Sequence, residues 1–158
     1  MSPNSPESIR SLILRMAGLY GPGRIPNAAE IRLNQPLAAP EHGYLNLIHV
    51  DDAASVVLAA AERAKPPRTY VVSDGHPVQR REYYEELARL LGAPPPKFAS
   101  PSPNAPASVR AASDKRARNA RMLAEMQVTL AYPSHREGLA AIVAAERAST
   151  ASTWGQTQ

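Results

Sequence analysis

A histidine and two aspartates lie close together in the segment NLIHVDD, residues 46–52, and could bind a metal or do acid–base chemistry. On an extended strand, His49 and Asp51 would point to the same side. Two ligands without a third do not make a typical metal site. Asp51 or Asp52 is also well suited to cap a following helix. We therefore expect helix capping, with no metal ligand and no catalytic residue among these three.

Most of the surplus positive charge lies in one short segment. The net charge is +4, and the basic residues Arg110, Lys115, Arg116, Arg118 and Arg121 surround the single acid Asp114. Nucleic-acid binders usually add aromatic residues or a known reader motif to such a run, and neither occurs here. We expect a solvated helix face or a contact with an acidic small molecule, and not a nucleic-acid partner.

Three further features allow two interpretations each. The turn Gly21-Pro22-Gly23 could approach a ligand or simply reverse the chain, since Gly supplies positive φ. Tyr20, directly before it, could stack on a ligand ring or pack in the core. Arg15 lies in an apolar strand candidate, where we favour a salt bridge to Asp51 or Asp52. His42, His76 and His135 lie in turns, and we expect them to be exposed.

Length and composition limit the classes of protein. The 158 residues, 44% of them hydrophobic, allow one domain with a moderate core. The absence of cysteine excludes disulfides, thiolate zinc sites and a cysteine nucleophile, and favours a reducing compartment such as the cytoplasm. No apolar run approaches the about 18 residues that a membrane span needs, and the polar residues 1–10 do not resemble a signal peptide.

The apolar spacing predicts alternating strands and helices. Leu12–Leu14 reads as a strand buried on both faces, and we expect further strands at 44–50 and 69–73. Helices are predicted at 25–34, 52–64 and 81–91, the last ended by Gly92. This alternation predicts an α/β fold with a small, mostly parallel sheet and flanking helices.

The second half of the sequence is less regular. Residues 94–106 are rich in proline and predict a loop or an extended crossing. A basic helix is expected at 114–126, capped by Ser113 or Asp114. Ser134 and Glu137 match a capping box that opens the last helix. We expect the folded part to span 11–147, with 148–158 as a disordered tail.

Four segments in this order resemble the extended and atypical short-chain dehydrogenases/reductases. They are LRMAGLYGPGR (14–24), NLIHVDDAA (46–54), SDGHPVQRREYYEELARLLG (73–92) and SDKRARNARMLAEMQVTLAYPSHREGL (113–139). The resemblance is to the C-terminal part of NAD-dependent epimerases/dehydratases, and in particular to nucleoside-diphosphate-sugar epimerase-like proteins. It implies a Rossmann-like fold and an NAD or NADP cofactor.

The departures from the family pattern imply that a first half is missing. The chain has no Gly-rich turn of the G-x-G-x-x-G kind, and no tyrosine is followed four residues later by lysine. The chain would then be the substrate-side half of an oxidoreductase, without turnover or tight dinucleotide binding when alone. The alternative is a non-catalytic binding or interaction module on a reductase-like scaffold.

The resemblance also implies a set of ligand-binding residues. Ala17 and Gly18 would face the cofactor, while Tyr20, Arg24, Lys115 and Arg116 would contact a small-molecule substrate. Typical epimerases carry asparagine at the position of Gly18 and an arginine near Leu45, and both groups reach substrate phosphates. Their replacement here argues against a nucleoside-diphosphate-sugar substrate, because leucine cannot bind a diphosphate.

A missing first half would leave a strand such as SLILRMA with an open edge. Open apolar edges recruit partners or aggregate. We therefore expect that the chain self-associates, pairs with an N-terminal half, or is only marginally stable, and we expect no membrane partner.

Overall fold

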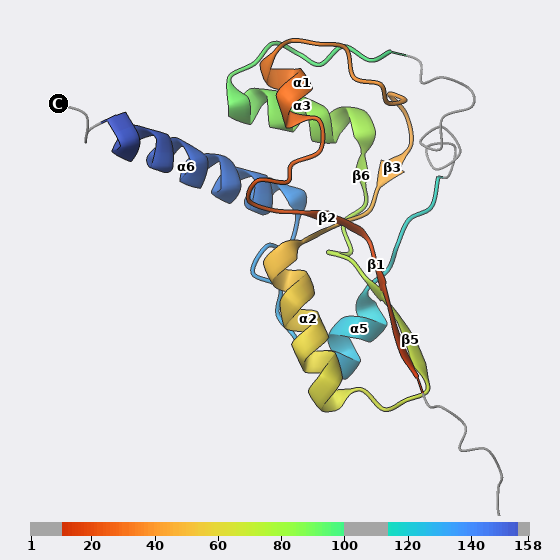
Figure 1. Ribbon diagram of the computed structural model, residues 1–158. Helices are drawn as coiled ribbons and strands as arrows, with labels where there is room; N and C mark the ends of the chain where they lie inside the picture. The colour runs from red at the N-terminus through yellow and green to blue at the C-terminus, as the bar shows by residue number, and fades with distance from the viewer. Residues whose placement is uncertain (1–10, 100–113, 155–158) are drawn as a thin grey trace, which may run out of the picture.

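The computed structural model describes residues 11–99 and 114–154, and Figure 1 shows them as two lobes joined by a central strand. One lobe, here called the sheet lobe, contains β1 (Leu12–Met16), β5 (Arg68–Val72), α2 (Val50–Arg63) and α5 (Ala120–Met126). The other, the helix lobe, contains α1 (Ala28–Arg32), β3 (Tyr44–Leu45), β6 (Val78–Gln79) and α3 (Arg80–Leu91). Between them lie β2 (Gly18–Tyr20) and β4 (Leu47–His49).

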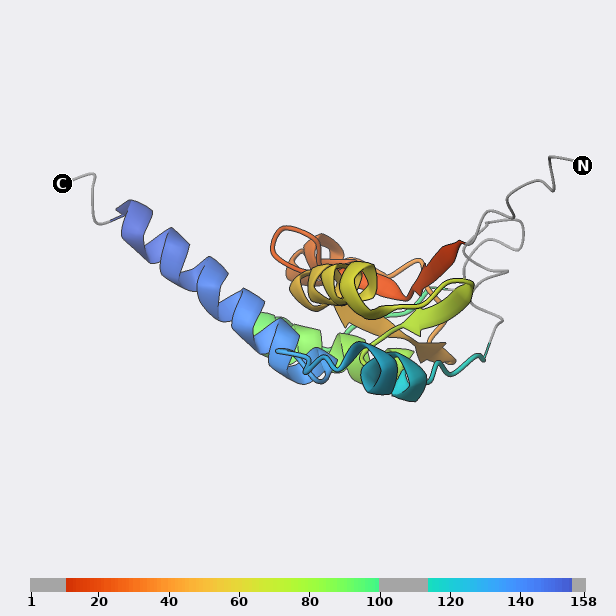
Figure 2. The same ribbon diagram turned by 90° about the horizontal axis from the view of Figure 1, so that it is seen from below.

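The last helix, α6 (His135–Trp154), starts at the junction of the lobes and packs against α3. Figure 2 shows its C-terminal end running out beyond the rest of the molecule. The predicted capping box is confirmed, because Ser134 N donates to Glu137 Oε2 at 2.9 Å and Arg136 N donates to Ser134 Oγ at 3.2 Å. We expected an aperiodic tail after Ala148, but α6 continues to Trp154.

The sheet lobe is built on a parallel pair of strands. β1 pairs with β5 in a register that runs from Leu12 opposite Arg68 to Met16 opposite Val72. Its core is formed by Tyr70 and Val72 of β5, Val56 of α2 and two methionines of α5. The predicted α/β class with small parallel sheets and flanking helices is confirmed.

The helix lobe encloses a second core. Tyr83 and Leu87 of α3 are completely buried, as the apolar stripe of that helix predicts, and they pack with Leu37 and Leu139. α3 ends where Gly92 adopts a left-handed φ of 68°. The start of the proline-rich segment pairs with the chain at Leu37, whose N–H donates to Lys97 O at 2.8 Å. Residues 100–106, like the predicted N-terminal segment 1–10, lie outside the described residues.

Three local predictions are wrong. Leu12–Leu14 is not buried on both faces, because only one face of the pair is packed and Ile13 is 51% exposed. Arg15 on the same strand is exposed and makes no ion pair with Asp51 or Asp52. His135 is buried, since it opens α6 against the ring of Tyr83.

The basic helix is also shorter than predicted. Regular helix begins only at Ala120, so Lys115, Arg116 and Arg118 do not lie on a helix face. The backbone at 115–117 is held by the side chain of Asn46 instead. Hydrogen bonds to another segment compete with helical ones for the same backbone groups, and here the helix starts only after the residues that Asn46 holds.

Asp52 fixes the segment that connects α5 to α6. We expected Asp51 or Asp52 to cap the helix, but the N-cap is His49, whose Nδ1 accepts from Asp51 N at 3.3 Å. The buried carboxylate of Asp52 accepts from Ala131 N at 2.7 Å and from Tyr132 N at 2.9 Å.

Within residues 11–99 and 114–154, no helix has the length and hydrophobicity needed to cross a lipid bilayer.

Replacing Asp52 tests this contact. Asp52→Ala leaves two backbone N–H groups without their acceptor, which costs about 2–4 kcal/mol of the free energy of unfolding. The neighbouring Asp51→Ala is the matched control, because its side chain is 69% exposed, and it costs less than about 1 kcal/mol. Urea denaturation measures both values, and equal losses would show that the contact does not stabilise the fold.

A second buried carboxyl, Asp74, follows β5. Its Oδ1 accepts from His76 N at 2.9 Å, while Oδ2 has no hydrogen-bond partner among the described residues. Burial raises the pKa of Asp74 to about 6, and the His76 N–H offsets this only in part. The pKa of Asp74 is higher in the folded chain than in the unfolded one. Its favourable contribution to the free energy of unfolding is therefore complete below about pH 4 and is lost as the pH rises past 6.

Asp74→Asn is therefore expected to raise the free energy of unfolding, relative to the parent, more at pH 7.5 than at pH 4. The difference in unfolding free energy between variant and parent should grow by about 2–3 kcal/mol over that range. Gln35→Ala, at an exposed side chain that carries no titratable group, should give a difference that does not change with pH. Denaturant melts at several pH values measure both, and a flat profile for Asp74→Asn would contradict the argument.

Candidate functional site

The central strand changes its pairing partner between β1 and β2. Ala17 N donates to Val72 O at 2.9 Å, and the next residue, Gly18, donates to Asn46 O at 2.9 Å. From Gly18 onward the chain runs parallel to β4 instead of β5. Crevices at the carboxyl ends of parallel strands, where the chain diverges, are the usual ligand sites of α/β proteins. Ala17 and Gly18, the two residues predicted to face a cofactor, lie at this change of partner.

Asn46 links the point where the strand changes partner to the basic segment. Its Nδ2 donates to Lys115 O at 2.8 Å, and its Oδ1 accepts from Ala117 N at 2.6 Å. Because its backbone oxygen also accepts from Gly18, the basic segment lies beside the point where the strand changes partner. The sequence analysis missed Asn46, and its signal is a lone amide between leucines in the segment YLNLIHV.

The basic segment carries positive charge that no carboxylate neutralises. Lys115, Arg116, Arg118 and Arg121 are exposed and have no acidic side chain within ion-pair distance among the described residues. Arg116 lies over the ring of Tyr44, with its guanidinium carbon 4.7 Å from the ring centroid. This cationic strip, residues 115–121, can attract an anion.

Gly18 lets the strand approach the chain at Asn46 and Leu47 closely. A Cβ at this position would lie 3.1 Å from Asn46 O and 3.2 Å from Leu47 Cδ2. These distances are tighter than ordinary contacts, so a larger residue would push against β4. The backbone of Gly18 is exposed and that of Ala17 is half-buried.

The other two predicted substrate residues do not join this group. Tyr20 is 1% exposed, and its hydroxyl donates to Ser134 O at 3.3 Å under the start of α6. It therefore packs in the core, one of the two roles that the sequence left open. Arg24 is exposed on a turn closed by its hydrogen bonds with Gly21, and among the described residues nothing connects it to Lys115 or Arg116.

Polar side chains at the ends of two strands are buried and incompletely satisfied. Nε2 of His49, the last residue of β4, and Oγ of Ser73, directly after β5, have no hydrogen-bond partner among the described residues. The His49 ring packs between Tyr20 and Tyr132, at centroid distances of 5.3 and 4.0 Å. Within the described ranges, no three metal-binding side chains come together.

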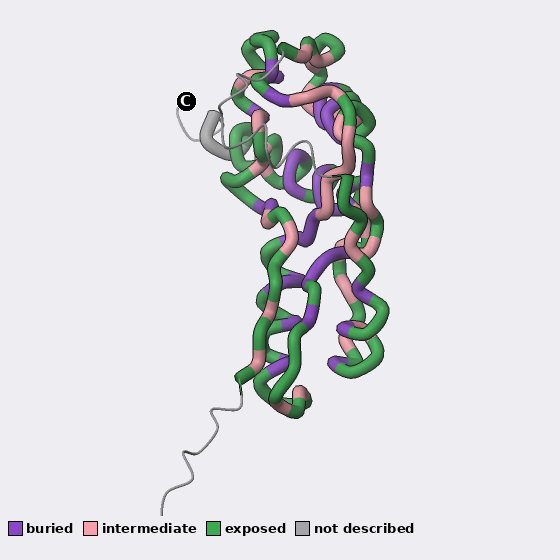
Figure 3. The backbone as a smooth tube through the Cα atoms, turned by 90° about the vertical axis from the view of Figure 1, so that its right-hand side faces the viewer, coloured by how far each residue is buried: buried purple, intermediate pink, exposed green. Residues whose placement is uncertain are grey.

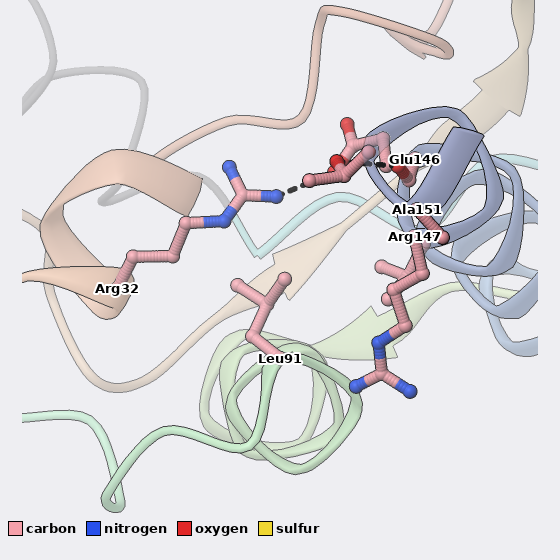
Figure 4. Close-up of a pocket in the computed structure, with 7 residues that line it drawn as sticks. Arg32, Leu91, Glu146, Arg147 and Ala151 are labelled. Atoms are coloured by element: carbon pink, nitrogen blue, oxygen red, sulfur yellow. Dashed lines mark hydrogen bonds and ion pairs between the residues drawn. The ribbon is translucent and has the colours of Figure 1, made fainter. Parts of the chain in front are cut away.

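A separate groove of about 540 Å³ lies between α1, α3 and α6 (Figure 4). An ion pair crosses it, with Arg32 Nη2 at 2.5 Å from Glu146 Oε2, and Leu91 lines its floor. Both of its arginines already have partners, since Arg32 is paired with Glu146 and Arg147 donates to Leu90 O. The groove therefore offers an anion fewer unpaired cations than the cationic strip does among the described residues.

Two relatives resemble the chain in sequence. Protein YeeZ of Escherichia coli K12 is 39% identical over 89 residues, which are 54% of this chain and 30% of YeeZ. The 3-diazoavenalumate denitrifying reductase of a Streptomyces species is 32% identical over 148 residues, covering 83% of this chain and 46% of that protein. No family model matches the chain.

Solved structures share its fold. A functionally unknown protein from Silicibacter pomeroyi has a TM-score of 0.67 at 30% identity, over 85% of this chain and 48% of that one. The UDP-glucose 4-epimerase of Thermotoga maritima, solved with UDP-glucose, scores 0.70 at 16% identity over 89% and 47%. The human epimerase family protein SDR39U1, solved with NADPH, scores 0.66 at 18% identity over 85% and 48%.

The chain spans less than half the length of each of these proteins. Its fold of small parallel sheets and flanking helices is shared with epimerases of known structure. The chain is related to the short-chain dehydrogenases/reductases, and it shares the fold of epimerases and dehydratases.

Proposed function

We propose that this chain is the substrate-side half of an NAD(P)-dependent epimerase/dehydratase-like oxidoreductase. The observation that carries the proposal is the change of strand partner at Ala17 and Gly18, with the cationic strip fixed beside it by Asn46. The backbone at Ala17 and Gly18 would form one wall of the nicotinamide site. Lys115 and Arg116 would hold an anionic group of the substrate.

The residues fit one wall of a dinucleotide site and no more. Gly18 is exposed and has no side chain, and the place that a Cβ would take is already crowded by Asn46 O and Leu47 Cδ2. The chain carries no Gly-rich turn whose N–H groups could hold a pyrophosphate. When bound, the cofactor would supply hydride transfer, while this chain orients the substrate. A tyrosine–lysine pair that could move the proton is absent from the sequence.

Cofactor binding by the chain alone tests the first part of the proposal. We expect no saturable binding of NADH or NADPH up to about 100 μM, because a wall without a phosphate-binding turn loses most of the contacts with the dinucleotide. Fluorescence titration of the purified 158-residue chain measures this. Saturable micromolar binding would show that the chain holds a complete dinucleotide site.

Anion binding at the cationic strip tests the second part. With pyrophosphate as the probe at low salt, the double variant Lys115→Ala/Arg116→Ala should bind about tenfold more weakly, a change of about 1.4 kcal/mol. Loss of the affinity with added salt is expected, because the strip is exposed. Isothermal titration calorimetry gives both values.

The matched control removes two basic residues that already have acidic partners. Arg81 and Arg89 are ion-paired on α3, so Arg81→Ala/Arg89→Ala should leave pyrophosphate binding within twofold of the parent. Equal losses in both double variants would mean that only net charge matters, and the strip would then not be a site.

A further inference from the structure

A small hollow lies at the amino ends of β1 and β5. The two strands are parallel, so Ser11 and Arg68 stand at one end of the pair and Ala17 follows the other end. The five residues of β1 span about 16 Å at about 3.3 Å per residue. The hollow has a volume of about 300 Å³ and is lined by two arginines, two residues with hydroxyl groups and two apolar residues, which are Arg68, Arg121, Ser11, Thr69, Ile13 and Pro67.

Positive charge exceeds negative charge around this hollow. Arg121 is exposed and has no carboxylate within ion-pair distance among the described residues. Nε of Arg68 lies 3.6 Å from Oε2 of Glu125, and the same carboxylate oxygen accepts from the hydroxyl of Tyr70. Glu125 does not line the hollow. One carboxylate, already shared with a tyrosine, therefore stands against two guanidinium groups.

The hollow also offers hydroxyl groups and apolar surface. Among residues 11–99 and 114–154, the hydroxyls of Ser11 and Thr69 have no hydrogen-bond partner. Ile13, opposite Thr69 in the register, is 51% exposed, and Pro67 adds a second apolar side chain. In Figure 3 the strand that leaves the grey N-terminal trace is coloured only as exposed or intermediate. An apolar group of a ligand could lie against this surface.

These groups together fit one class of ligand. Guanidinium groups form planar donor forks that match the oxygens of phosphates and carboxylates, and hydroxyl groups can donate to the same oxygens. Small-molecule sites measure about 300–1,000 Å³, so this hollow suits a ligand with a single ring or a short aliphatic chain.

We propose that the hollow is a binding site for a small organic oxyanion, a phosphate or carboxylate carried on an apolar body. The oxyanion lies between Arg68 and Arg121 and accepts a hydrogen bond from the hydroxyl of Thr69. The apolar body rests on Ile13.

This site is separate from the one in the proposed function. Lys115, at one end of the cationic strip, is held beside Gly18 by Asn46. Arg121, at the other end of the strip, lines the hollow at the start of α5, which packs beside β5 (Figure 1). The hollow would therefore bind its ligand whether or not the proposed function is correct.

A titration that resolves single residues gives the first test. Phenyl phosphate is added to the full 158-residue chain, and the backbone amides are followed by NMR. The amides of Ile13, Thr69 and Arg121 should shift along one saturable curve. No response of these three at millimolar phenyl phosphate would overturn the proposal. A response confined to Gly18 and Asn46 would overturn it too, and would leave the proposed function intact.

Matched variants give the second test. Arg121→Ala should weaken phenyl phosphate binding at least about fivefold, because hydrogen bonds between charged groups are the strong ones. Arg118→Ala removes the same charge from the same strip, and Arg118 is exposed and does not line the hollow. It should change the affinity by less than about twofold, because salt screens an exposed charge that does not touch the ligand. Equal losses would show that only net charge matters, and the hollow would then not be a site.

A third variant covers the case in which Arg121→Ala disturbs the start of α5. Thr69→Val keeps the shape of an exposed side chain and removes only its hydroxyl. It should weaken phenyl phosphate binding by about threefold or more. An unchanged affinity in both Thr69→Val and Arg121→Ala would refute the proposed contacts.

The class of ligand is tested with two further probes. Ile13→Ala should weaken phenyl phosphate binding by about threefold, because apolar contact area is lost, and should leave the binding of inorganic phosphate unchanged. Benzoate, titrated in parallel, distinguishes the two oxyanions, since tighter benzoate binding assigns a carboxylate and tighter phenyl phosphate binding assigns a phosphate. Inorganic phosphate that binds as tightly as both organic probes would overturn the assignment of an organic ligand.

Discussion

The change of partner between β1 and β2 is the constraint on which the rest of the structure depends. The pairing of β1 with β5 ends at Val72, but the chain continues from β1 into β2. β4 takes over the hydrogen bonds of β2 from Gly18 onward. The two pairings meet at one peptide, and the apolar side chains on either side of it form two separate cores.

Two polar side chains hold segments that belong to no strand or helix against the rest of the chain. Asn46 holds the basic segment at Lys115 and Ala117, and Asp52 holds the connection before α6 at Ala131 and Tyr132. Both act on backbone groups that no helix or strand would otherwise satisfy, and unpaired backbone groups are costly once they are covered. Both also belong to the segment 46–52, so one stretch of sequence fixes two distant ones.

The sequence predicted the elements that depend on local patterns. α3 followed from its apolar stripe and from Gly92, and the start of α6 followed from Ser134 and Glu137. The resemblance carried by four motifs led to the correct class and to the relationship with reductases and epimerases. The site residues assigned from that resemblance stay predictions, although Ala17, Gly18 and the basic segment do lie together around Asn46.

The errors share a physical cause, which is contact between segments far apart in sequence. The hydrogen bonds of Asn46 replace the first turns of the basic helix, and no helical propensity between 114 and 119 could reveal this. An apolar strand normally has both faces covered, so the pattern at Leu12–Leu14 could not show that only one face is packed. The imidazole of His49 acts as the helix cap because it is packed between two tyrosines.

The accuracy of the proposed cofactor wall depends on one strand pairing. Ala17 and Gly18 directly follow β1, and β1 pairs only with β5 among the described residues. A wall made of backbone can be positioned only as accurately as the sheet that holds it. The packing of Leu14, Tyr70 and Val72 on one face of this pair therefore also fixes where the proposed wall lies.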